Sequence, residues 1–314
     1  MLIDNLLLSV GAMKSGTTWM HRVLNRHPKI ISSHAKEIHY FAHVHLPGET
    51  ALSARERLAR AKSYAAVDPE SHSPASVRRR LLWTAKYLNE PIDDRWYADL
   101  FDERPRDVYR SDFSNLYAHL GPSGWDHVHR VAGTVRVIFT MRDPIERLWS
   151  HVRFNTQTAG RNEGIWKWTP EQLEAYVRRD DMWKHGEYGA TIRRLREALS
   201  EQELRLFFFE DIHSDRHAWL RQMEEHLGLE PYDYPAEVVN GRYAESTAIP
   251  MPEWFPGLFR SDVERIVTEL SELGLEPPSR WLSHFSDEAG SKARPGLVDV
   301  TKKVRRTLMS RFRA

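Results

Sequence analysis

The segment from Leu6 to Trp19 constrains the fold more than any other part of the chain. It starts with a short apolar run, continues into a loop bounded by Gly11 and Gly16, and ends in two threonines that open a helix. In such an arrangement, backbone N–H groups of the loop and the positive end of the helix converge on one anion. The sequence therefore predicts a strand–loop–helix unit that binds a nucleotide phosphate.

The position of the lysine separates this loop from the common loop of ATP- and GTP-binding proteins. That loop has the pattern G-x-x-x-x-G-K-[ST], with lysine directly after the second glycine. Here Gly11 and Gly16 keep the spacing, but Thr17 occupies the lysine position and Lys14 lies inside the loop. We predict that the loop binds a nucleotide phosphate other than the triphosphate of ATP or GTP.

Apolar runs alternate with amphipathic segments along the chain, and this alternation indicates the fold class. Residues 6–10, 135–141 and 204–209 have the continuous apolar character of buried parallel strands. Shorter strands are expected at 30–31 and 107–110. Helices are expected at 17–27, 54–65, 76–88, 94–101, 188–199, 214–227 and 261–273. The pattern predicts an α/β fold with a central, mostly parallel sheet flanked by helices.

The expected organisation is one domain over residues 1–286, with a helical insertion at about 50–104 and a basic tail at 287–314. The last part of the tail, 301–314, has six basic residues and no acidic one, and its apolar residues recur at helical spacing. A helix of this kind can lie on an anionic membrane. A solvated or packed terminal helix is the interpretation that we favour over membrane contact.

Composition excludes several classes of function. The net charge of +1 gives no overall attraction to nucleic acid. The absence of cysteine rules out disulfides, thiolate metal sites and cysteine catalysis. The N-terminus lacks the basic region of a signal peptide, and no apolar run reaches membrane-spanning length. A cytoplasmic protein without a catalytic metal is expected.

A second phosphate-binding element follows the strand at 135–141. Arg142 leaves the end of that strand, and Ser150 lies about two turns along the next helix. A guanidinium binds phosphate through two parallel hydrogen bonds, and a hydroxyl adds a third donor. Ligands of parallel sheets bind beyond the carboxyl ends of the strands, where Lys14 and Arg142 both lie. We expect these two elements to hold one ligand.

The two motifs K-S-G-T-T-W (14–19) and R-D-P-x-x-R-x-x-S (142–150) together resemble the sulfotransferase family. Members of that family use 3′-phosphoadenosine 5′-phosphosulfate (PAPS) and release adenosine 3′,5′-bisphosphate (PAP). The resemblance implies a P-loop-like sulfotransferase fold and a nucleotide site on two elements. The 5′-phosphosulfate would bind Lys14, Ser15, Gly16, Thr17, Thr18 and Trp19, and the 3′-phosphate would bind Arg142 and Ser150. Gly241 and Arg242 resemble the family's K-G-R loop over the 3′-phosphate.

The segment E-I-H-Y-F at 37–41 resembles the E-I-H-F-F segment of the Golgi glycosaminoglycan sulfotransferases, in which the glutamate is the catalytic base. The resemblance implies that Glu37 takes the acceptor's proton while Lys14 neutralises charge on the departing phosphate. His39 would orient Glu37 or the acceptor, and shares the side of Glu37 if the segment is extended. Burial beside apolar neighbours is expected to raise the pKa of Glu37 towards working pH.

The segment D-F-S-N-L-Y at 112–117 lies where those enzymes read E-K-T-P-A-Y, and Phe113 replaces their lysine. This difference argues against a heparan-like acceptor. Asp112 and Phe113 are predicted at the acceptor site, although Asp112 fits the capping of a turn equally well. Carbohydrate, lipid, phenol and small natural products all fit as acceptors, through either a hydroxyl or an amine.

Two other functions compete with sulfonate transfer. A nucleoside or small-molecule kinase with an atypical phosphate loop is one alternative, but Thr17 occupies the lysine position and no acidic strand end suits magnesium. A non-catalytic protein that binds a nucleotide or a membrane is the other. Lys14 and Glu37 together argue against it.

Overall fold

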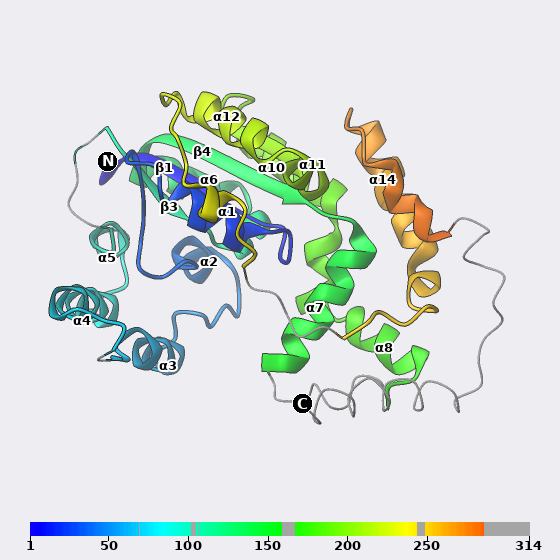
Figure 1. Ribbon diagram of the computed structural model, residues 1–314, viewed down its shortest axis with the longest axis horizontal. Coiled ribbons are helices and arrows are strands. Elements are labelled where there is room, and N and C mark those ends of the chain that lie inside the picture. Colours follow the sequence, from blue (N-terminus) through cyan, green and yellow to red (C-terminus); the bar gives the residue numbers. More distant parts are fainter. Residues whose placement is uncertain (69, 102–104, 106, 159–166, 244–248, 286–314) are drawn as a thin grey trace.

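A computed structural model describes residues 1–285 except 69, 102–104, 106, 159–166 and 244–248 (Figure 1). Its centre is a sheet in which every pairing is parallel. The strands are β1 (Ile3–Ser9), β2 (Ile30–Ser32), β3 (Tyr109–Asp112), β4 (Ala132–Met141) and β5 (Leu204–Phe208), in the order β2-β3-β1-β4-β5. The predicted α/β fold with a parallel sheet is confirmed.

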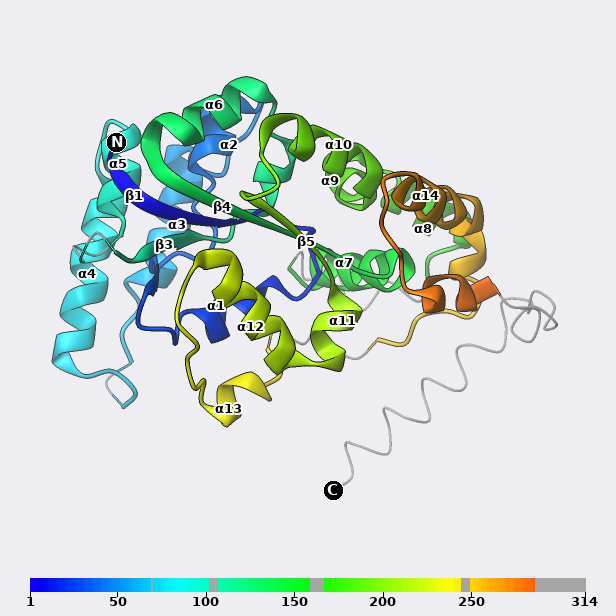
Figure 2. The same ribbon diagram turned by 90° about the horizontal axis from the view of Figure 1, so that it is seen from above.

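Helices cover both faces of the sheet because its central strand is apolar on both sides. Leu6 and Leu8 point to one face and Leu7 to the other, and all three are fully buried. Leu7 packs with α1 (Thr17–Leu24) and α12 (Arg216–Leu227). Leu6 and Leu8 pack with α6 (Pro122–Val131) and α10 (Tyr188–Ala198). Figure 2 shows these helices on opposite sides of the strands.

Two further groups of helices flank the sheet on either side in Figure 1. The first lies between β2 and β3 and contains α2 (Tyr40–His45), α3 (Ala54–Tyr64), α4 (Pro74–Leu88) and α5 (Asp94–Asp99). The second follows β4 and has its own core, to which α7 (Pro144–Thr158), α8 (Pro170–Val177), α9 (Asp180–Trp183) and α14 (Arg260–Glu272) contribute. The other helices of the described ranges are α11 (Phe209–Ser214), α13 (Ala236–Val239) and the 3₁₀ turns η1 (Asn115–His119), η3 (Lys184–Gly186), η4 (Pro256–Phe259) and η5 (Ser279–Phe285).

The structure differs from the sequence-based prediction at several elements. The helix expected at 214–227 is α12, which begins at Arg216, because the side chain of Asp215 caps it by accepting from the Ala218 N–H at 2.9 Å. Helices α2, α6, α8, α9, α11 and α13 were not predicted. Across the described ranges, no helix is both long and apolar enough to cross a membrane. The tail at 301–314 lies outside the described residues.

Candidate functional site

The glycine-rich loop is fixed against the end of β4. The Ala12 N–H donates to the Thr140 carbonyl at 2.7 Å, and the Thr140 N–H donates to the Gly11 carbonyl at 2.8 Å. Lys14 has a φ of 71°, which is unusual for a residue with a Cβ atom. Parallel pairing of β1 with β4 therefore carries the loop and Arg142 to the same edge of the sheet.

Gly16 must be glycine for two reasons. Its φ is 80°, and a Cβ atom would lie 2.8 Å from the ring of Phe209. The same ring lies 4.7 Å below the guanidinium of Arg142 and packs in a tilted arrangement against His213, at a centroid distance of 4.1 Å. Phe209 therefore connects the loop to the second element. Phe209 was not among the predicted site residues, although a position directly after β5 is where a site residue is expected.

Arg142 contacts the loop directly. Its Nη1 donates to the Lys14 carbonyl at 3.1 Å, and its Nη2 lies 3.5 Å from a carboxylate oxygen of Glu146. Ser150 lies two turns further along α7 and is buried. The two elements therefore lie together at one edge of the sheet, and their binding of one ligand stays a prediction.

Four cationic side chains converge here: Lys14, Lys36, Arg142 and Arg153. Burial lowers the pKa of Lys14 to about 8, and repulsion from the other three adds to this effect. The Lys14 ammonium lies over the ring of Phe154 at 4.2 Å. Arg153 has a buried Nε without a hydrogen-bond partner among the described residues. Mutual repulsion of this kind is relieved by a bound polyanion.

Lys36 is a member of this group that sequence analysis missed. Its ammonium donates to the hydroxyls of Thr17 at 3.1 Å and Thr18 at 3.3 Å, and lies 3.4 Å from Oε1 of Glu37. It therefore bridges the threonines of the loop and the expected base. Its position next to Glu37 in the sequence is the feature from which Lys36 could have been predicted as a site residue.

Glu37 is ionised in this environment. Burial alone raises its pKa, but hydrogen bonds and charge from His39 and Lys36 outweigh burial and lower the pKa to about 2. Our expectation of a raised pKa is therefore wrong in direction. The side chain is 36% exposed, and its Oε2 lies 3.6 Å from Nε2 of His39. The two side chains lie on a loop that ends where α2 begins. His39 is the N-cap residue of α2 and has a φ of 63°.

Asp112 lies beneath this loop and is fully buried. Its carboxylate accepts from the hydroxyls of Ser114 at 2.6 Å and Tyr117 at 2.7 Å, and from the Ile38 N–H at 3.3 Å. The hydroxyl of Ser114 accepts in turn from the His39 N–H at 2.9 Å. Burial raises the pKa of Asp112. These contacts place Asp112 as a support for the segment that carries Glu37 and His39.

Phe113 is also inside the protein. It is 1% exposed, and its ring packs edge-on against His21 at 5.2 Å. Its N–H donates to the Lys36 carbonyl at 3.1 Å. The apolar residue at the family's lysine position thus lies directly beside a lysine from another segment.

Trp19 of α1 contacts the segment that leads to Gly241. Trp19 is 4% exposed, and its indole N–H donates to the Val239 carbonyl at 2.9 Å. The Gly241 N–H donates to Val238 at 3.3 Å, and Arg242 is exposed. Their predicted contact with the nucleotide stays a prediction.

The helices between β2 and β3 pack directly on the segment that carries Glu37. Arg60 of α3 donates from Nη1 to the Glu37 carbonyl at 2.9 Å. The ring of His34 lies 5.8 Å from that of Tyr64 and 5.4 Å from that of Trp83. Within the described part of the chain, no three His, Cys, Asp or Glu side chains are grouped as metal ligands.

The sequence model of the Sulfotransferase family matches residues 7–234. A sulfotransferase from Alicyclobacillus acidocaldarius has a similar structure, with a TM-score of 0.58 and 18% identity over 88% of this chain and 98% of that one. The sulfotransferase domain from the curacin biosynthetic pathway also has a similar structure, with a TM-score of 0.51 and 15% identity. That match covers 86% of this chain and 98% of the other one. No curated protein matches the sequence. At these identities the structural likeness concerns the fold.

Proposed function

Because the chain belongs to the sulfotransferase family, we propose that it transfers a sulfonate group from PAPS to a hydroxyl or amine of an acceptor. The observation that carries the proposal is the set of four cations around the loop, with the ionised Glu37 beside them. A donor with two phosphate positions and one sulfonate matches this charge. Cationic groups of this kind stabilise charge that develops during transfer.

The residues present fit such a donor. Lys14, Thr17, Thr18 and the backbone of the loop would hold the 5′-phosphosulfate, and Arg142 with Ser150 would hold the 3′-phosphate. The hydroxyl of Ser15 is buried without a hydrogen-bond partner in the described part of the chain, as is Nε of Arg153. A phosphate or sulfonate held by the loop would offer acceptors to both groups.

Glu37 would accept the proton of the acceptor while the acceptor's oxygen or nitrogen forms its bond to sulfur. The bond between sulfur and the bridging oxygen breaks, and its electron pair goes to the 5′-phosphate, where the Lys14 ammonium offsets the new charge. With a pKa of about 2, Glu37 is ionised at neutral pH but is a weak base. Positioning of the acceptor therefore supplies much of the rate.

We propose that Lys36 takes over the role of the family's missing lysine. Phe113 occupies that lysine's position, and its backbone N–H donates a hydrogen bond to the Lys36 carbonyl. The Lys36 ammonium reaches Thr17, Thr18 and Glu37 from this place. It would contact the sulfonate oxygens and hold Glu37 in its ionised form.

Lys36→Met is expected to lower kcat about 10²-fold, because one pre-positioned donor to the developing charge is lost. Lys36→Arg should restore part of the rate, since it returns the charge. The Met variant should also titrate Glu37 at a higher pH, visible as a new acidic limb in kcat/KM. Wild-type kinetics in Lys36→Met would contradict this role.

Thermal shift separates the donor proposed here from the kinase alternative. PAP at a hundred times its dissociation constant should stabilise the protein by about 2.7 kcal/mol, whereas ATP with magnesium should not. Arg142→Ala should abolish most of the shift, and Arg205→Ala, at an exposed arginine of β5, should keep it. A response to ATP alone would overturn the proposal.

The acceptor would enter beside Glu37, under the helices between β2 and β3. Carbohydrate, lipid, phenol and small natural products are the classes to screen with labelled donor. We propose a single domain over residues 1–286, with the helices at 50–104 as an insertion. A cytoplasmic location stays a prediction.

A further inference from the structure

Positive charge is concentrated on α3 and α4. The two helices contain eight basic residues and one acidic residue, whereas the whole chain has a net charge of +1. Helix α4 has no acidic residue. The charge is therefore a local property of this pair of helices.

Three of the eight cations are used inside the protein. Arg57 pairs with Glu90, Arg60 donates to the Glu37 carbonyl, and Arg80 donates to the Tyr64 carbonyl at 3.0 Å. The other five are exposed and have no ion-pair partner among the described residues: Arg55, Lys62, Arg78, Arg79 and Lys86. Unpaired cations at this density favour an anionic partner.

Exposed apolar side chains lie between these cations. On α3, Leu58 is 62% exposed and follows Arg55 by one turn. On α4, Leu81 and Leu82 are 48% and 55% exposed and follow Arg78 by one turn. Side chains at i, i+3 and i+4 share one face of a helix. Both helices therefore present a stripe in which leucine is flanked by arginine or lysine.

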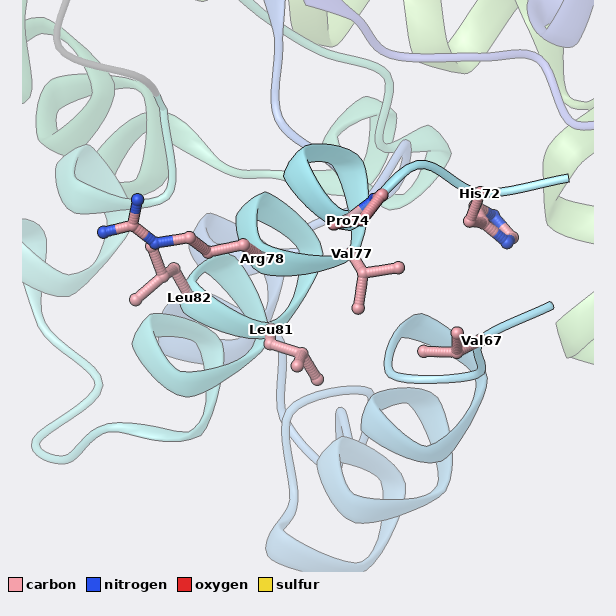
Figure 3. Close-up of a pocket in the computed structure, with 7 residues that line it drawn as sticks. All are labelled: Val67, His72, Pro74, Val77, Arg78, Leu81 and Leu82. Carbon is pink, nitrogen blue, oxygen red and sulfur yellow. The ribbon is translucent and has the colours of Figure 1, made fainter. Parts of the chain in front are cut away.

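A hollow of about 660 Å³ opens beside this stripe. Figure 3 shows Val77 and Leu81 of α4 facing Val67 across it, with Leu82 and Arg78 on the neighbouring side of the helix. Its lining is largely aliphatic and consists of Val67, His72, Pro74, Val77, Arg78, Leu81 and Leu82. It shares no lining residue with the phosphate loop.

The charge and side-chain composition of this surface favour one kind of binding partner over others. A second copy of the chain would bring like charges together, which costs several kcal/mol. Protein interfaces are enriched in aromatic residues and carry directional hydrogen bonds, but Trp83 and Tyr87 of α4 point inward and are buried. Aliphatic side chains with flanking arginine and lysine complement the acyl chains and headgroups of an anionic bilayer.

We propose that the outer surface of α3 and α4 binds an anionic membrane. Leucine side chains would enter the region between headgroups and acyl chains, while the five unpaired cations contact lipid phosphates. The hydrogen bond from Arg60 to the Glu37 carbonyl joins α3 to the segment that carries the base. This inference concerns binding and is independent of the proposed transfer.

Sedimentation of the full chain with vesicles tests the proposal. We expect binding to vesicles of phosphatidylcholine and phosphatidylglycerol in equal parts, and little binding to phosphatidylcholine alone. Arg78→Gln with Arg79→Gln should weaken binding about 30-fold, since each cation near an anionic surface contributes about 1 kcal/mol. Leu81→Gln with Leu82→Gln should weaken it at least tenfold, because buried apolar area is lost.

The charge-matched control is Arg26→Gln with Arg205→Gln, two exposed arginines outside the two helices, which should retain most of the binding. All variants keep the tail at 301–314, so a contribution from the tail is the same in each. A wild-type chain that ignores anionic vesicles overturns the proposal. Equal weakening in the control pair, or none in the α4 pairs, overturns it too.

Discussion

Glu37→Gln is expected to lower kcat by about 10²- to 10⁴-fold, the usual contribution of a general base. The amide keeps the size of the side chain but cannot accept a proton from the acceptor. Because the donor would contact the loop and Arg142, the affinity for PAP should change little. Initial rates with labelled donor and calorimetry with PAP measure the two quantities separately.

The matched control for this variant is Glu197→Gln, at an exposed position on α10 far from Glu37 in the sequence. It should keep the wild-type rate. Loss of PAP binding in Glu37→Gln would show that Glu37 supports the loop rather than the chemistry. Full activity would remove Glu37 as the base.

Lys14→Met is expected to lower kcat/KM about 10³-fold, because the variant loses a charge that both binds the donor and stabilises the departing phosphate. The side chain lies inside the loop, against Phe154 and close to three other cations. Lys29→Met is the control, since Lys29 forms an exposed ion pair with Asp107. A loss below tenfold in Lys14→Met would contradict the role.

The pH dependence of PAP affinity gives a second measurement on Lys14. Its pKa in the free protein is about 8, and a bound anion raises that pKa by stabilising the charged form. Affinity should therefore be constant below about pH 8 and fall up to tenfold per pH unit above it. Lys14→Met should lack this limb, and an unchanged limb there would assign it to another group.

The sheet was predictable because its strands are nearly continuous apolar runs between clear turn residues. Leu6 to Leu8 and the run at 135–141 could be identified without contacts, and parallel pairing brings their carboxyl ends together. Helix ends were less predictable. The helix expected from residue 214 begins at Arg216, since its start depends on a single side-chain hydrogen bond to the cap residue Asp215.

The sequence by itself determined the phosphate-binding loop, the second element at Arg142 and the family, because these depend on local spacing at strand ends. Only the tertiary structure decided the charge of Glu37, the burial of Asp112 beneath it and the approach of Lys36 to the threonines of the loop. A pKa is set by distances to a few groups, and burial by elements far apart in the chain. Neither quantity is encoded in local spacing, so folding was needed to establish them.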